Sequence, residues 1–174
     1  LTTRDIPDYD ELMTKRLNIL KENNFKLTDI KEVINTLEPL DGAIEFHKWL
    51  RSEFEVIILS DTFYQFVSPL MKKLDYPTLF CHQLVIDTND SIIGYKLRQP
   101  NGKQEAVKAL QNLNFKVVAA GDSYNDIGML KQANEGILFD PPENVISDYP
   151  QFSVSMSYVD FQKKLEACKI KFEK

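Results

Sequence analysis

Two carboxylates, four residues apart, follow an apolar run and are the side chains of this sequence best suited to chemistry. Asp122 and Asp126 lie in the stretch 121–130, directly after the apolar run 116–120. In an open α/β sheet, ligands collect where buried strands end and helices begin, because unpaired N–H groups face a crevice there. Asp122 at the strand end and Asp126 one helical turn later can face the same point. A site with only two carboxylate ligands suits Mg²⁺, because this ion keeps several waters and shares its coordination sphere with substrate phosphate.

Another set of polar residues follows an earlier apolar run. Ser60, Asp61 and Thr62 come directly after the run 56–59. A serine or threonine hydroxyl beside free backbone N–H groups can cradle a phosphate. The plainer alternative is that Ser60 only caps the next helix. Lys103 begins another predicted helix, where its charge can neutralise a phosphoryl group, unless it is simply a solvated lysine.

The elements that must position these residues alternate between strands and helices. Strands are predicted at 56–59, 116–120 and 136–139, a β-hairpin at 78–86 and 92–98, and helices at 63–74, 103–113, 125–133 and 158–169. This alternation favours the α/β class, with a Rossmann-like doubly wound parallel sheet. Residues 8–52 instead show the periodicity of three helices, the second capped by Thr28. We therefore predict a helical cap over 1–40 and an α/β core over 41–174.

Composition and charge exclude several classes of partner. The 174 residues carry a formal net charge of -5 and no basic run, so nucleic acid is not expected as a partner. No stretch approaches the roughly 18 apolar residues of a membrane helix, and no signal peptide is visible. Cys81 and Cys168 fit no metal or disulfide pattern, and we expect a cytoplasmic protein with no membrane partner. His47 and His82 are isolated and receive no role, and the oligomeric state stays open.

The order of hydroxyl, lysine and acid pair along the chain resembles motifs II, III and IV of the haloacid dehalogenase superfamily of phosphohydrolases. Longer segments look like the ThrH branch of that superfamily, which contains phosphoserine phosphatases that also act as phosphoserine:homoserine phosphotransferases. The segments that carry this resemblance are 4–10, 58–63, 94–99, 120–126, 136–139 and 142–146. The resemblance implies a phosphoserine substrate, with water or homoserine as the acceptor, and Mg²⁺ as the cofactor.

The resemblance also implies roles for the matching residues. Asp122 would be the direct Mg²⁺ ligand, and Asp126 would hold the waters of the metal. Ser60 would hydrogen-bond the phosphoryl group, and Lys103 would offset the charge of the phosphorylated intermediate. Asn125 would contact the substrate or its phosphate.

Three further residues belong to the predicted substrate-binding set. Arg16 looks like the arginine that receives the substrate carboxylate, for which a planar guanidinium is well suited. Without the resemblance, a solvated helix arginine would be the preferred interpretation. Asp61 and Thr62 stand where ordinary phosphoserine phosphatases have glycines, which fits the ThrH branch.

In this superfamily, the first aspartate of an Asp-x-Asp motif attacks phosphorus and forms an aspartyl phosphate. The stretch 8–10 has the right letters but follows no strand, and 87–90 is better explained as a hairpin turn. The resemblance implies that the motif lies on a strand before Leu1, between the strands that end at Ser60 and Ala120. On this hypothesis the 174 residues are an inactive fragment, and an intact mass of only 20.1 kDa for the natural product would contradict it.

Two other functions compete with an Mg²⁺-dependent phosphoserine phosphatase. A catalytically inactive relative would keep the phosphate and metal pocket without the nucleophile, and would bind phosphoserine without turnover. A phosphoacceptor receiver domain also places acids and a lysine at strand ends. The helical first third and the hairpin argue against a receiver domain, which has no cap.

Overall fold

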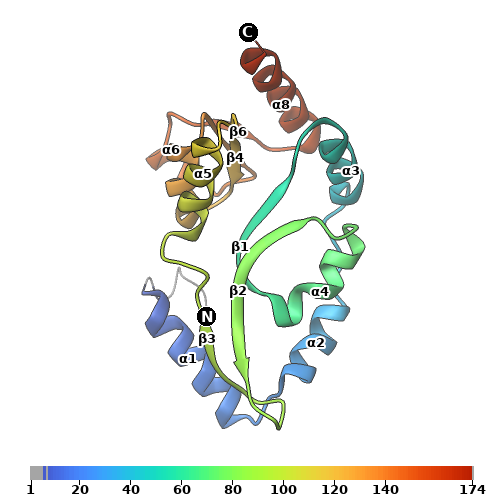
Figure 1. The fold of residues 1–174 in the computed structure, drawn as a ribbon, viewed down its shortest axis with the longest axis vertical. Helices are drawn as coiled ribbons and strands as arrows, with labels where there is room; N and C mark the ends of the chain where they lie inside the picture. The colour runs from blue at the N-terminus through green and yellow to red at the C-terminus, as the bar shows by residue number, and fades with distance from the viewer. Residues whose placement is uncertain (1–5, 7, 174) are drawn as a thin grey trace. The chain divides into compact units, whose positions relative to one another are not determined.

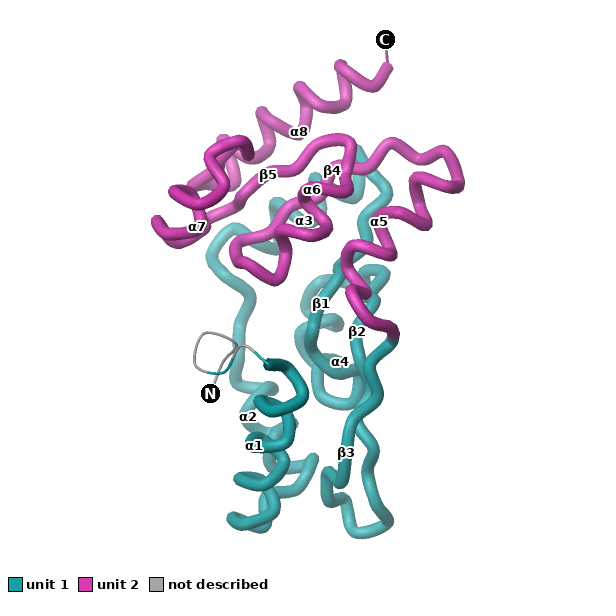
Figure 2. Tube along the Cα trace, turned by 90° about the vertical axis from the view of Figure 1, so that its left-hand side faces the viewer, with its two compact units in different colours: residues 1–98 teal, residues 99–174 magenta. Residues whose placement is uncertain are grey.

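The computed structural model describes residues 6 and 8–173, which form two compact units. The first unit spans residues 1–98 and the second spans residues 99–174 (Figure 2). Each unit contains its own three-stranded sheet. Arg4, Asp5 and Pro7, which belong to the resembling segment 4–10, lie outside the described residues. The proposed division into a cap over 1–40 and a core over 41–174 stays a prediction.

The first unit combines helices with a mixed sheet (Figure 1). Its elements are α1 (Tyr9–Glu22), α2 (Leu27–Asn35), α3 (Ala43–Glu53), β1 (Ile57–Phe63), α4 (Tyr64–Lys73), β2 (Thr78–Ile86) and β3 (Ile92–Lys96). Strand β1 pairs in parallel with β2, and β2 pairs antiparallel with β3. The predicted hairpin is therefore confirmed, although its second strand ends at Lys96 rather than at residue 98.

A shared apolar core fixes helix α1 against this sheet. The buried members of the core are Met13, Leu27, Phe63, Leu84 and Ile92, which come from two helices and all three strands. Complete burial of each such side chain contributes about 1.5–3 kcal/mol. The polar residues of α1 and β1 are therefore carried on one packed framework.

The turn of the hairpin caps helix α2. The sequence predicts Thr28 as the N-cap, but α2 begins at Leu27, and Thr28 lies in its first turn. Asp90, at the hairpin tip, accepts hydrogen bonds from the Thr28 backbone N–H at 2.9 Å and from the Thr28 hydroxyl at 2.7 Å. A carboxylate is a stronger acceptor than a hydroxyl and also suits the positive end of the helix dipole. The N-cap residue is Lys26, while an acceptor for the first turn comes from Asp90, distant in the sequence, so the prediction of Thr28 as the N-cap is wrong.

The second unit is an alternation of helices and parallel strands. Its elements are α5 (Gly102–Asn112), β4 (Val118–Gly121), the 3₁₀ turn η1 (Tyr124–Asp126), α6 (Ile127–Gln132), β5 (Glu135–Phe139), α7 (Glu143–Asp148), β6 (Ser153–Ser155) and α8 (Tyr158–Phe172). Strand β5 pairs in parallel with both β4 and β6. The single helix predicted at 125–133 is divided into η1 and α6, and α7 and β6 were not predicted.

The α/β class with parallel pairing and a hairpin is confirmed, but the strands form two sheets rather than one. Their orders are β1-β2-β3 and β4-β5-β6. Helix α4 connects β1 to its neighbour β2, and α6 connects β4 to its neighbour β5. Each of these crossovers therefore joins two adjacent parallel strands. Among the described residues, β1 and β4 each pair along one edge only.

Two further observations concern the length of the described helices and the state of the two cysteine thiols. Within residues 6 and 8–173, none of the helices combines the length and the apolar character needed to cross a membrane. Cys81 and Cys168 are free thiols, and burial raises the pKa of both, that of Cys81 to about 11. Both thiols therefore stay protonated at neutral pH and are poor nucleophiles.

Candidate active site

The first polar group, residues 60–62, lies inside strand β1 rather than after it. Between the pair Leu59–Phe80 and the pair Phe63–His82, residues 60–62 of β1 stand opposite a single residue of β2. Such a bulge bends the strand and re-aims its side chains, and bulges are frequent beside functional sites. The predicted strand end at residue 59 is thus wrong, but the interrupted ladder still frees residues 60–62 from regular pairing.

Ser60 is oriented by a bond within this bulge. The backbone N–H of Thr62 donates to Ser60 Oγ at 3.3 Å. The Ser60 hydroxyl therefore acts as an acceptor here and keeps its own proton to donate elsewhere. Helix α4 follows with Phe63 at its N-cap and no side-chain cap, so the alternative that Ser60 caps this helix is wrong.

Asp61 faces a buried histidine of the neighbouring strand. Asp61 Oδ1 lies 3.6 Å from His82 Nε2, and the side chains are 39% and 10% exposed. His82 Nδ1 accepts the backbone N–H of Arg98 at 3.2 Å, so the proton of a neutral imidazole lies on Nε2, toward Asp61. The sequence assigned His82 no role, because this relation depends on the pairing of β1 with β2.

Arg16 lies on α1, two helical turns after Tyr9. Its Nη1 lies 4.0 Å from the sulfur of Met13, and the side chain is half-buried. Burial is the main cause that raises the pKa of the Tyr9 hydroxyl to about 12; the Asp61 carboxylate adds to this, and Arg16 opposes it. Arg16, Asp61 and Tyr9 therefore lie in one electrostatic neighbourhood of the first unit.

The second polar group is built around the buried carboxylate of Asp126. Asp126 Oδ1 lies 2.8 Å from Lys103 Nζ, and the side chains of both residues are largely buried. Asp126 Oδ2 accepts the backbone N–H groups of Asp122 and Ser123 at 3.1 and 3.3 Å, and the Ser123 hydroxyl at 3.1 Å. Asp126 thus fixes the turn after β4 and holds the Lys103 ammonium in one position.

Gly121 permits this arrangement because it has no side chain. A Cβ atom built on Gly121 would lie 2.4 Å from Asp126 Cβ and 2.7 Å from Asp126 Oδ2. Since the Asp126 carboxylate is held by Lys103 and by two backbone N–H groups, it has no easy way to move aside. The glycine at the end of β4 is therefore a packing requirement of the Lys103–Asp126 pair.

Replacing Gly121 with alanine is expected to lower the free energy of unfolding by about 1–3 kcal/mol, the usual cost of overpacking. Denaturant unfolding measures this. Gly102→Ala is the matched control, since its Cβ would meet only Gln99 Cγ at 3.8 Å and alanine favours a helix. Equal stability of the Gly121→Ala variant and the wild type would show that Asp126 is not held as described.

Asp122 and Asn125 are the exposed members of the second group. The Ser123 hydroxyl lies 3.3 Å from Asp122 Oδ1 and also contacts Asn125 Oδ1. An exposed carboxylate with amide and hydroxyl oxygens beside it is a set of hard donors and fits Mg²⁺. In the described part of the chain, no three His, Cys, Asp or Glu side chains are arranged to hold a metal ion. The chain therefore offers a partial oxygen site centred on Asp122.

The predicted site residues thus fall into two groups. The first unit holds Arg16, Ser60, Asp61 and Thr62, and the second unit holds Lys103, Asp122, Asn125 and Asp126.

The stretches 8–10 and 87–90, which were rejected as nucleophile motifs, have structural roles. Asp8 caps α1 by accepting the Glu11 N–H at 2.8 Å, and Asp87 accepts two backbone N–H groups of the hairpin turn at 2.8 Å.

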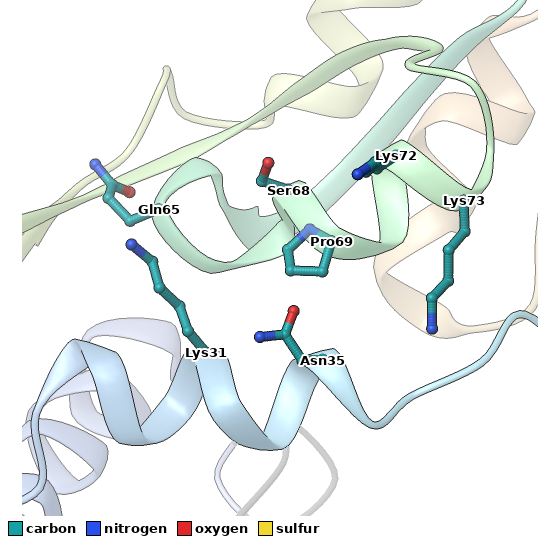
Figure 3. Close-up of a pocket in the computed structure, with 7 residues that line it drawn as sticks. All are labelled: Lys31, Asn35, Gln65, Ser68, Pro69, Lys72 and Lys73. Carbon is teal, nitrogen blue, oxygen red and sulfur yellow. The ribbon is translucent and has the colours of Figure 1, made fainter.

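A cavity of about 720 Å³ lies between α2 and α4 of the first unit (Figure 3). Its lining consists of Lys31, Asn35, Gln65, Ser68, Pro69, Lys72 and Lys73. Two of these side chains already have protein partners. Lys73 pairs with Glu38 at 2.6 Å, and Gln65 bonds both backbone groups of Leu84. The cavity contains none of the predicted site residues.

Comparison with known proteins identifies similar chains. The family model of haloacid dehalogenase-like hydrolases matches residues 4–134. Phosphoserine phosphatase ThrH of Pseudomonas aeruginosa is 56% identical over 163 residues, which cover 94% of this chain and 80% of that protein. A phosphoserine phosphatase of Pseudomonas syringae pv. tomato is 53% identical, with 94% and 69% covered. The similarity therefore spans both groups of predicted site residues.

Solved structures resemble this one in fold. A crystal structure of a phosphoserine phosphatase in apo form superposes with a TM-score of 0.75 at 22% identity, covering 94% of this chain and 83% of that one. At this identity the likeness concerns the fold alone. It agrees with the α/β architecture described above.

Proposed function

Because this chain belongs to the haloacid dehalogenase-like hydrolases, we propose that it acts as a phosphoserine phosphatase, hydrolysing O-phospho-L-serine to serine and phosphate. The observation that carries the proposal is the 56% identity to a protein named for this activity, over 94% of the chain. The fold alone would not suffice, because one fold supports many chemistries. The Lys103–Asp126 pair and the bulge at 60–62 support the proposal with groups suited to phosphate.

The residues of the chain have separable tasks in this reaction. The Ser60 hydroxyl donates a hydrogen bond to a phosphoryl oxygen, and Asn125 contacts the phosphate or the substrate. Lys103, held by Asp126, places a fixed positive charge beside the transferring group, where it stabilises developing negative charge. Because Asp126 already orients the ammonium, little reorganisation is needed as the charge develops.

Asp122 would hold Mg²⁺ directly, and Asp126 would support the waters of the metal. When bound, Mg²⁺ neutralises charge on the phosphoryl oxygens. The exposed carboxylate of Asp122 suits the first task, since its described contact is the Ser123 hydroxyl at 3.3 Å. Asp126 is committed to Lys103 and to backbone N–H groups, which suits an indirect role.

The proposed reaction has two displacement steps. A carboxylate oxygen forms a bond to phosphorus while the serine oxygen leaves and takes up a proton. Water then attacks the aspartyl phosphate, releasing phosphate and restoring the carboxylate. None of the carboxylates discussed above is assigned as the attacking group, so activity is to be measured on the complete natural gene product.

Incubation of that product with O-phospho-L-serine is expected to release serine and phosphate in equal amounts. Removal of divalent ions with EDTA should abolish the release, and added Mg²⁺ should restore it. Adding homoserine and measuring O-phosphohomoserine separates hydrolysis from transfer. Tight binding of phosphoserine without phosphate release would instead identify a catalytically inactive relative and overturn the proposal.

A further inference from the structure

The cavity between α2 and α4 is basic, although the protein as a whole is acidic. Among the described residues that line it are three lysines, Lys31, Lys72 and Lys73, and no Asp or Glu. Across the whole sequence, 26 acidic residues outnumber 21 basic ones. The other members of the lining each add an amide or hydroxyl group, except Pro69. The cavity therefore offers positive charge and hydrogen-bond donors, which together suit an anion.

The charges of Lys31 and Lys72 are not neutralised at close range, since neither lysine forms an ion pair within the described part of the chain. The residues three and four positions from Lys31 along α2 are uncharged. Hydrogen bonds from Thr28 lower the pKa of the Asp90 carboxylate, and Lys31 adds to this from a longer distance. Lys72 lies in the last turn of α4, where it suits the negative end of the helix dipole. Lys31 lies in the middle of α2, where the dipole gives no reason for its charge.

Both helices contribute side chains to this cavity (Figure 3). Lys31 and Asn35 lie one turn apart on α2 and extend toward α4. Ser68 and Lys72 lie one turn apart on α4, and residues at this spacing share one face of a helix. The volume of about 720 Å³ falls within the usual range of small-molecule sites, roughly 300–1,000 Å³. The size and the two-sided lining fit a small molecule bound between α2 and α4.

A second cavity, of about 260 Å³, continues this basic surface to α3. Its lining consists of Ile44, His47, Lys48, Arg51, Ser52, Lys73, Leu74 and Asp75. Lys73 therefore belongs to both cavities, which we together call the basic site. Arg51 donates to the Asp75 backbone carbonyl at 2.9 Å and to the Asp75 carboxylate at 3.3 Å. Lys48 forms no ion pair with any residue that the structure describes, so its charge is available to a ligand.

His47 gives the smaller cavity an unmet polar requirement. The side chain is 9% exposed, and its Nε2 has no hydrogen-bond partner among the described residues. Buried polar groups without a partner are rare, and a bound ion or water is a usual explanation. Burial is the main cause that lowers the pKa of His47; Arg51 adds to this, and Asp75 opposes it. The imidazole is therefore neutral at neutral pH and can donate one N–H to an anion.

We propose that the basic site binds a small polyanion, a molecule with at least two phosphate or carboxylate groups. Lys31 and Lys72 hold one group in the larger cavity, and Lys48 and the His47 N–H hold another in the smaller cavity. Such a ligand joins α2, α3 and α4, so its binding stabilises the folded first unit. None of the residues proposed for phosphoserine hydrolysis lines either cavity, so this inference is independent of the proposed function.

The test uses the complete natural gene product in buffer freed of divalent ions on a chelating resin. Titration calorimetry with pyrophosphate and with citrate measures the binding of a phosphate polyanion and of a carboxylate polyanion. We expect saturable binding of at least one of them, with a higher midpoint of thermal unfolding in its presence. Absence of binding by both would overturn the proposal.

Lysine substitutions locate the binding. Lys31→Met and Lys72→Met are each expected to weaken polyanion binding about tenfold, the usual contribution of a hydrogen bond to a charged group. Lys21→Met is the matched control, because this exposed lysine of α1 removes the same charge outside both cavities. The control should bind as the wild type does. Equal affinity in all four proteins, or equal weakening in all three variants, would overturn the site.

Two substitutions of His47 test the part assigned to the smaller cavity. His47→Leu removes the N–H and should weaken polyanion binding about three- to tenfold. It should not lower the free energy of unfolding, because the buried Nε2 has no described partner to lose. His47→Gln keeps an N–H donor and should retain more of the affinity. Equal affinity of the two variants would overturn the role of the His47 N–H.

Orthophosphate tests the requirement for two anionic groups. It carries one group, so its Lys31-dependent binding should be at least about tenfold weaker than that of the polyanion. Lys31-dependent binding of equal strength would overturn this requirement.

Discussion

Replacing Lys103 with methionine is expected to reduce both stability and activity by large factors. The substitution leaves the Asp126 carboxylate, 5% exposed, without its ion-pair partner. Removing one partner of a buried pair costs about 3–5 kcal/mol in the free energy of unfolding. In the full-length protein, loss of the fixed ammonium should also lower kcat for phosphoserine about 100- to 1,000-fold. Denaturant unfolding and steady-state kinetics measure the two effects.

A double variant separates the two effects. Adding Asp126→Asn to Lys103→Met removes the unpaired charge, so most of the stability should return while activity stays low. Lys108→Met is the matched control on the same helix, because Lys108 is 55% exposed and lies 3.8 Å from Glu105. Such exposed pairs contribute about 0–1 kcal/mol. Recovery of full activity in the double variant would refute a catalytic role for the Lys103 ammonium.

Replacing Asp122 with asparagine is expected to remove activity while leaving the fold intact. The carboxylate is exposed, and its described contact is one Ser123 hydroxyl, so stability should change by less than about 0.5 kcal/mol. Loss of the proposed metal carboxylate should lower kcat/KM for phosphoserine about 1,000-fold in the full-length protein. It should also raise the Mg²⁺ concentration that gives half-maximal activity.

Asp140 supplies the control for this substitution. It follows β5 as Asp122 follows β4, and its side chain is also exposed. Asp140→Asn conserves the shape of the side chain and should leave kcat/KM and the Mg²⁺ requirement near the wild-type values. Full activity of Asp122→Asn would show that this carboxylate does not hold the metal.

Much of the fold could be predicted because its signals are local. Apolar runs bounded by polar residues indicated β4 and β5, and the cluster at 87–91 indicated the hairpin turn. Asp87 accepts the backbone N–H groups of Asn89 and Ser91, which lie within four residues of it. Short-range features of this kind are visible in sequence because the chain makes them with its immediate neighbours. The short elements α7 and β6 lack such a signal and were missed.

The order of residues along the chain sets which chemical groups are available: a hydroxyl after the first apolar run, a lysine at a helix start and two acids after a later run. The way these groups are held depends on contacts between distant parts of the chain. The bulge at 60–62, the tautomer of His82 and the burial of Asp126 against Lys103 all depend on contacts across the fold. Local periodicity cannot encode such contacts, because they form only when distant strands and helices pack together.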